Sequence, residues 1–177
     1  KALIYMELAK EEGSDTEKYA ETAYEAVVKS RQLDDKQLFV QENTNNLLTL
    51  STMFLNGGSK YYNQAINQKN DELFKKSLQS FENFFHVMKS LGEDSTQVMT
   101  FLKSNNMPYT DILVFTGFSA YKAGSMQKAK QYYQRLFQFK SEDLMYDKVG
   151  IPYAFITYCK ILSQEGNIDK AITVIDK

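Results

Sequence analysis

The sequence predicts an all-α protein, because apolar residues recur at spacings of three and four along almost the whole chain. Sustained alternation of the kind found in β-strands is hard to find. Only two prolines occur among the 177 residues, so the usual helix breaker is nearly absent. Apolar residues make up 43% of the chain and charged residues 24%, which is typical of a globular protein with a buried core. We therefore expect a single helical domain spanning residues 1–177.

The N-terminal part of the chain predicts two short helices. The first covers about residues 2–10 and ends at Gly13. Ser14 and Glu17 have the spacing of a capping box, in which each side chain accepts a backbone amide of the other residue. A second helix is therefore expected over about residues 15–30.

The middle of the chain predicts two longer helices, over about residues 43–68 and 72–90. Gly57 and Gly58 interrupt the first of them and cost a helix interior roughly 2 kcal/mol relative to alanine. Such a pair either breaks the helix or lets a neighbouring backbone approach closely. We expect a continuous but weakened helix over about residues 43–68. After the helix over residues 72–90, a short helix is expected over residues 96–103.

The C-terminal part predicts two more helix pairs, over residues 111–123 with 126–139, and over residues 153–164 with a last helix from about residue 168. Gly124 and Gly166 stand in the turns within these pairs, and a linker containing Gly150 and Pro152 separates them. The last helix is still running at Lys177, so we expect the native chain to continue.

The segment from Gly117 to Tyr133 resembles the core of a tetratricopeptide repeat. That family places a small residue on its first helix, a glycine in the turn, an alanine on the second helix and an aromatic residue four positions later. The corresponding residues here are Gly117, Gly124, Ala129 and Tyr133, and the final pair repeats the pattern with Cys159, Gly166, Ala171 and Ile175. Small residues are needed where two helices cross closely.

Two looser copies precede these, with Ala20 and Ser77 in the alanine position. The resemblance implies an α-solenoid of about four antiparallel hairpins, over residues 2–33, 43–90, 111–140 and 153–177, stacked as a right-handed superhelix. The copies are spaced more widely and less regularly than the family period of about 34 residues. We therefore expect irregular repeat lengths.

Composition and motifs argue against several function classes. The formal net charge is −1, so no global positive field favours nucleic acid, and no apolar run is long enough to span a membrane. Single residues each of histidine and cysteine do not form a multi-ligand metal site. We expect His86 at the surface and Cys159 as a small packing residue. No catalytic residues, metal or cofactor are predicted, and the protein is not expected to be an enzyme.

The resemblance implies a groove that binds a protein or peptide, lined by the inner faces of the first helices. Carried over by position from the two good copies, this groove consists of Val114, Phe118, Tyr121, Lys122, Tyr153, Ile156, Lys160 and Gln164. Exposed aromatic side chains with lysine at the rim suit a peptide or a partner helix. A non-catalytic binding scaffold is therefore the leading hypothesis, unless a further repeat or the chain's own inserted segments cover this face.

Two other functions stay open at this point. The 11 Asn, 12 Gln and 12 Tyr residues suit glycan or small-ligand binding, and some bacterial outer-membrane glycan-capture proteins are built on such repeats. The chain is also consistent with a sensory or regulatory segment of a longer signalling protein. The sequence identifies neither the oligomeric state nor the compartment, although the absence of an initial methionine favours export.

Overall fold

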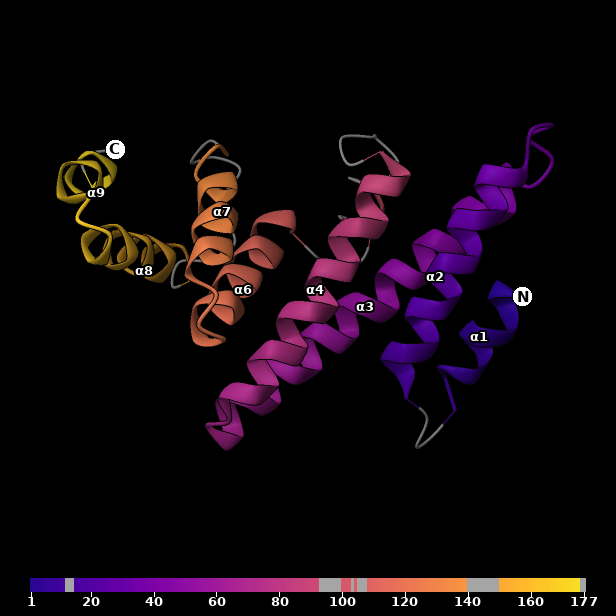
Figure 1. The fold of residues 1–177 in the computed structure, drawn as a ribbon, viewed down its shortest axis with the longest axis horizontal. Helices are drawn as coiled ribbons and strands as arrows, with labels where there is room; N and C mark the ends of the chain where they lie inside the picture. The colour runs from indigo at the N-terminus through magenta and orange to yellow at the C-terminus, as the bar shows by residue number, and fades with distance from the viewer. Residues whose placement is uncertain (12–14, 93–99, 103, 105–107, 140–149, 176–177) are drawn as a thin grey trace. The chain divides into compact units, whose positions relative to one another are not determined.

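A computed structural model describes residues 1–11, 15–92, 100–102, 104, 108–139 and 150–175. Regular secondary structure in these ranges is entirely helical, which confirms the all-α prediction. The helices, labelled in Figure 1, are α1 (Ala2–Leu8), α2 (Thr16–Leu33), α3 (Val40–Gln68), α4 (Asp71–Leu91), α6 (Tyr109–Lys122), α7 (Met126–Leu136), α8 (Gly150–Gln164) and α9 (Ile168–Ile175).

The predicted helices agree with the observed ones except at their ends. α2 begins one residue later than predicted, and its N-cap is Asp15, whose carboxylate accepts the Lys18 amide at 3.3 Å. α8 begins at Gly150, so Pro152 lies in its first turn, where a missing amide hydrogen costs little. Gly13, Ser14 and most of the helix expected over residues 96–103 lie outside the described residues.

The chain divides into two compact units, and each is described by itself. Unit 1 comprises residues Lys1–Lys60 and Gln79–Thr100. Unit 2 comprises residues Tyr61–Leu78 and Phe101–Lys177. The N-terminal part of α3 and the C-terminal part of α4 therefore belong to unit 1. The C-terminal part of α3 and the N-terminal part of α4 belong to unit 2. The expectation of a single domain stays a prediction.

In unit 1, α3 remains continuous through Gly57 and Gly58, as predicted, because α4 packs closely against both glycines. A Cβ atom on Gly58 would lie 2.6 Å from the Phe81 ring, and one on Gly57 would lie 2.6 Å from Ser80 Oγ. Ser80 Oγ in turn donates to the Phe54 carbonyl oxygen at 3.0 Å. The two glycines thus lower the helix propensity of α3, but their lack of a side chain lets α4 pack closely, with the fully buried Phe81 beside Gly58.

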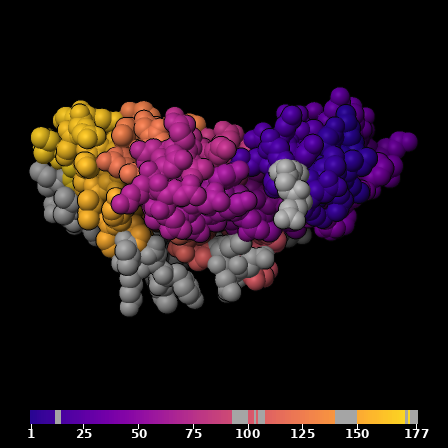
Figure 2. Space-filling model, turned by 90° about the horizontal axis from the view of Figure 1, so that it is seen from below, coloured from indigo at the N-terminus to yellow at the C-terminus, as the bar shows by residue number. Residues whose placement is uncertain are grey.

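In unit 2, α6 pairs with α7 and α8 pairs with α9, and α8 also contacts both helices of the preceding pair. Figure 2 shows the yellow residues of the α8–α9 pair lying against the orange residues of the α6–α7 pair. Large side chains fill the space between these helices, including Leu113, Tyr133, Leu136 and Ile161, each of which is less than 2% exposed. Packed helix pairs are therefore the building block of this unit.

The three helix pairs within the described residues of unit 2 share one turn geometry. In each turn an amide donates to the carbonyl oxygen five residues earlier, from Asn70 to Ala65 at 3.1 Å, from Ser125 to Ala120 at 2.8 Å and from Asn167 to Leu162 at 2.8 Å. This is the Schellman arrangement, which requires a left-handed residue in between. Gly124 and Gly166 supply it with φ of +77°, and Lys69 supplies it with φ of +50°.

Candidate binding surface

The small residues that predicted the helix crossings lie at close contacts between helices. A Cβ atom on Gly117 of α6 would collide with the ring of Tyr133 of α7. Tyr133 and Ala129 are both fully buried. The residue that makes a glycine necessary at position 117 is therefore the aromatic residue of the pattern, Tyr133.

Cys159 occupies the corresponding position on α8. Its Sγ donates a weak hydrogen bond to the Ala171 carbonyl oxygen of α9 at 3.6 Å, and the Ala171 side chain is buried. Partial burial raises the pKa of the Cys159 thiol. The neutral thiol is therefore favoured at neutral pH, as suits a packing residue.

Phe118 lies at the centre of an aromatic cluster in unit 2. Its ring centroid lies 5.7 Å from that of Tyr62, 5.5 Å from that of Phe74 and 5.3 Å from that of Tyr153. Phe115 joins the cluster through Tyr62 at 5.0 Å. We call these five residues the Phe118 cluster. It brings together the end of α3, the start of α4, α6 and the start of α8.

The Phe118 cluster changes the composition of the predicted groove. Phe118 is half-buried by its aromatic neighbours, and Val114 is only 6% exposed, so neither presents a free side chain. The groove prediction did not include Tyr62 and Phe74. Tyr62 precedes the polar turn at residues 68–71 and Phe74 follows it. This was the sequence signal that could have identified them, because apolar residues on both sides of a turn between paired helices commonly pack together.

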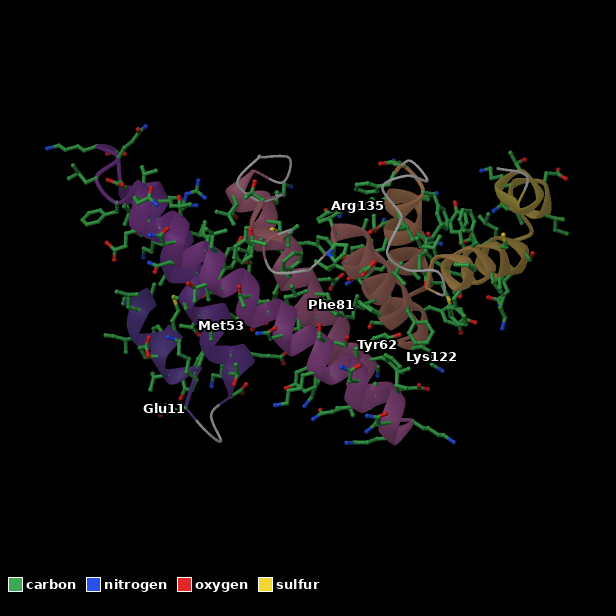
Figure 3. All side chains as sticks on the ribbon, turned by 180° about the vertical axis from the view of Figure 1, so that it is seen from behind. Glu11, Met53, Tyr62, Phe81, Lys122 and Arg135 are labelled. Carbon is green, nitrogen blue, oxygen red and sulfur yellow. The ribbon has the colours of Figure 1, made fainter. Side chains whose placement is uncertain are left out.

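Lys122 lies at the C-terminal end of α6 beside this cluster. Its Nζ is 3.9 Å from Asp71 Oδ1 and 5.9 Å from the centroid of the Phe74 ring. Figure 3 shows Tyr62 and Lys122 close together at this end of α6. A long, exposed ion pair of this kind contributes little to stability, so the ammonium group can rearrange towards a partner.

The other half of the predicted groove forms an exposed stripe on α8. Tyr153 is 47% exposed and Ile156 is 66% exposed, and Lys160 and Gln164 continue the stripe by one turn each. The opposite side of α8 is buried through Ala154, Tyr158, Ile161 and Leu162. We call Tyr153, Ile156, Lys160 and Gln164 the α8 stripe. The contact between Phe118 and Tyr153 joins it to α6, where Tyr121 is half-buried.

An ion pair links α7 to the turn between α8 and α9. Lys130 Nζ lies 2.8 Å from Oε1 and 2.8 Å from Oε2 of Glu165, and Gln127 Nε2 donates to Glu165 Oε1 at 2.8 Å. The hydrogen bond from Lys130 lowers the pKa of Glu165. This contact holds adjacent helix pairs together and lies outside the predicted groove.

His86 is exposed on α4, as predicted, and its backbone carbonyl accepts a hydrogen bond from the Tyr24 hydroxyl at 3.3 Å. Among the residues that the structure describes, no three His, Cys, Asp or Glu side chains are grouped to hold a metal ion. None of the described helices combines the length and apolar character needed to cross a membrane.

Comparisons with protein families, with curated proteins and with solved structures found no match for this chain. The fold and its geometry define it as an all-helical protein of packed helix pairs.

Proposed function

We propose that the chain is a non-catalytic binding protein that holds a peptide or helix of another protein against the α8 stripe and the adjoining end of α6. The observation that carries this proposal is the row of exposed side chains on α8, with Tyr153 and Ile156 at 47% and 66% exposure. Aromatic and large aliphatic side chains that stay exposed on a rigid helix commonly mark interaction sites. The proposed surface therefore has an apolar half and a polar half.

The support beneath this surface suits binding without large rearrangement. Tyr153 rests on Phe118, which is itself held by Tyr62 and Phe74. An aromatic side chain that is fixed before binding loses little conformational entropy when a partner arrives. Tyr153 is accordingly the residue expected to contribute most to affinity.

The polar half of the surface favours a partner with acidic residues. Lys160 is exposed on the α8 stripe and makes no ion pair within the described part of the chain. Lys122 makes a long ion pair with Asp71 and lies over the Phe74 ring. An apolar anchor flanked by a carboxylate is therefore the expected sequence feature of the bound peptide, and its association should weaken with added salt.

Peptides selected from a displayed library on the intact chain, followed by titration of labelled peptide, test the proposal. Ile156→Glu and Tyr153→Ser are expected to weaken binding at least tenfold. Ile4→Glu is the matched control, because Ile4 on α1 is 64% exposed and lies outside the proposed surface. Equal affinities for Ile156→Glu, Tyr153→Ser and the control would place the binding site elsewhere.

The glycan hypothesis predicts a different pattern with the same variants. A sugar ring stacks on a tyrosine but gains little from an exposed isoleucine. Binding on a glycan panel that is lost in Tyr153→Ser and kept in Ile156→Glu would favour a carbohydrate ligand over a peptide.

A further inference from the structure

The connection between α2 and α3 carries an unusual density of exposed apolar side chains. Leu33 and Leu38 are each 71% exposed, Phe39 is 51% exposed and Val40 is 53% exposed. We call residues 33–40 the apolar tip. In Figure 1 this purple segment projects beyond the adjoining ends of α2 and α3. Single exposed apolar residues are ordinary, but four within eight residues on a projecting segment indicate an interaction surface.

The backbone of the apolar tip is fixed by Asp34. Its two carboxylate oxygens accept the amides of Leu38 at 2.8 Å and Phe39 at 2.7 Å, and its carbonyl oxygen accepts the Gln37 amide at 2.9 Å. Gln37 adopts φ of +54°, a conformation that costs energy in a residue with a side chain. The apolar side chains are therefore held outward on a rigid turn, so that docking has a small ordering cost.

The polar side chains around the apolar tip carry both signs of charge. Asp35, Lys36 and Glu42 are all exposed, as are the amides of Gln32 and Gln37, and each amide both donates and accepts hydrogen bonds. A surface that carries both signs of charge together with amides has a partner for each polar group on a second copy of itself across a two-fold axis. A membrane fits less well, because a rim of mixed sign gains little attraction to anionic lipid.

We propose that the apolar tip is a self-association surface, at which two copies of the chain dock about a two-fold axis. Leu38 and Phe39 of each copy pack together at the centre, and Lys36 of one copy faces the acidic side chains of the other. This contact lies in unit 1 and is independent of the binding surface proposed in unit 2.

The exposed area sets the expected strength of this dimer. At about 150–200 Å² for each whole side chain and exposed fractions of 51–71%, the four apolar side chains present on the order of 400 Å² per copy. A standard stable interface buries about 800 Å² per partner. The tip supplies about half of that area, so we expect a weak dimer that dissociates reversibly on dilution.

Sedimentation velocity on the intact chain from about 1 to 500 μM tests the proposal. The wild type is expected to shift from monomer to dimer over this range. Leu38→Ser/Phe39→Ser should raise the dissociation constant at least tenfold, with an unchanged helical circular-dichroism spectrum. The matched control is Leu3→Ser/Ile4→Ser, because these neighbours on α1 are 51% and 64% exposed, and it should dimerise as the wild type does.

Two further variants locate the contact without removing apolar area. Lys36→Glu should weaken the dimer, and Asp35→Lys/Lys36→Asp should restore it, because exchanging the signs preserves self-complementarity.

In a Cys159→Ser background, Leu38→Cys should form a disulfide-linked dimer faster than Leu3→Cys. A chain that stays monomeric at 500 μM would overturn the proposal, as would masses beyond the dimer, equal loss in the α1 control, or binding to anionic vesicles that depends on Leu38 and Phe39.

Discussion

The ring of Tyr133 on α7 lies against the α-carbon of Gly117 on α6, in the space that any larger side chain at position 117 would occupy. Tyr133 is fully buried, so its ring has little room to move away. The same relationship holds between Phe81 on α4 and Gly58 on α3 in unit 1. In both helix pairs, a glycine in the middle of a helix is explained by an aromatic ring on the partner helix.

Gly117→Ala is therefore expected to destabilise the protein, although alanine is the better helix former. The gain in helix propensity is about 1 kcal/mol, whereas overpacking a buried contact costs about 1–3 kcal/mol. Urea denaturation should show a net loss on the order of 1 kcal/mol. In a Tyr133→Leu background the same substitution should lose less, because the colliding ring is gone. Higher stability for Gly117→Ala alone would contradict the packing described.

The Tyr133 hydroxyl gives a second prediction. It is buried without a partner at hydrogen-bonding geometry among the described residues, and burial raises its pKa, an effect that the nearby Thr157 hydroxyl only partly opposes. Tyr133→Phe should therefore leave stability at neutral pH unchanged or raise it by about 1 kcal/mol. A loss of stability on that scale would mean that the hydroxyl is paired with Thr157.

The raised pKa of Tyr133 also predicts a dependence on pH. Above about pH 10 the tyrosine ionises in the unfolded chain but stays protonated in the folded one, so its contribution to stability falls as pH rises. The wild type should lose stability relative to Tyr133→Phe by up to about 1.4 kcal/mol per pH unit between pH 10 and 12. Parallel unfolding curves at pH 8, 10 and 11.5 measure this difference, and identical pH profiles for the two proteins would rule out the effect.

Lys69 gives a third prediction, because it stands where Gly124 and Gly166 stand in the other two turns. A residue with a side chain costs about 1–2 kcal/mol in this left-handed conformation, and glycine avoids that cost. Lys69→Gly is expected to stabilise the protein by on the order of 1 kcal/mol, and Gly124→Ala to destabilise it by a similar amount. Thermal melts should show a higher Tm for Lys69→Gly and a lower Tm for Gly124→Ala. The control is Lys75→Gly on the exposed face of α4, which should lower the Tm because glycine there is in a helix interior.

These turns show how far the sequence could predict the fold. Periodicity and turn glycines located most helix ends, because glycine in a turn and small residues at a crossing leave local signals. The turn after α3 carries no glycine. The close contact of Gly58 with Phe81 lies about one helical turn farther from this turn than the contact of Gly117 with Tyr133 lies from its own turn. The repeat pattern has a fixed spacing between its small residue, its turn and its aromatic residue, so it could not find the contact between Gly58 and Phe81.

The candidate surface was harder to predict, because it depends on which helices lie side by side. The resemblance to tetratricopeptide repeats placed Tyr153, Ile156 and Lys160 on the exposed side of one helix, and they are exposed. It could not show that Phe118 is covered by Tyr62 and Phe74, which come from helices more than forty residues earlier in the chain. The apolar tip was not predicted, because Leu38 and Phe39 are apolar residues of the kind expected in a core, and the sequence did not show that Asp34 fixes their backbone in an exposed turn.

The Glu165 contact gives the last prediction, at acidic pH. Lys130 holds the pKa of Glu165 below its ordinary value, so the folded protein keeps this carboxylate ionised at a pH where the unfolded chain binds a proton. Its stabilising effect is therefore complete above the unfolded pKa of about 4.3 and is lost as pH falls through the lower folded pKa. Lys130→Met should remove this part of the acid dependence, whereas Lys128→Met, one residue from the buried Ala129 on the same helix, should keep it. Unfolding curves between pH 3 and 6 compare the two variants. If both variants retained the wild-type slope, the pairing of Lys130 with Glu165 would not persist in solution.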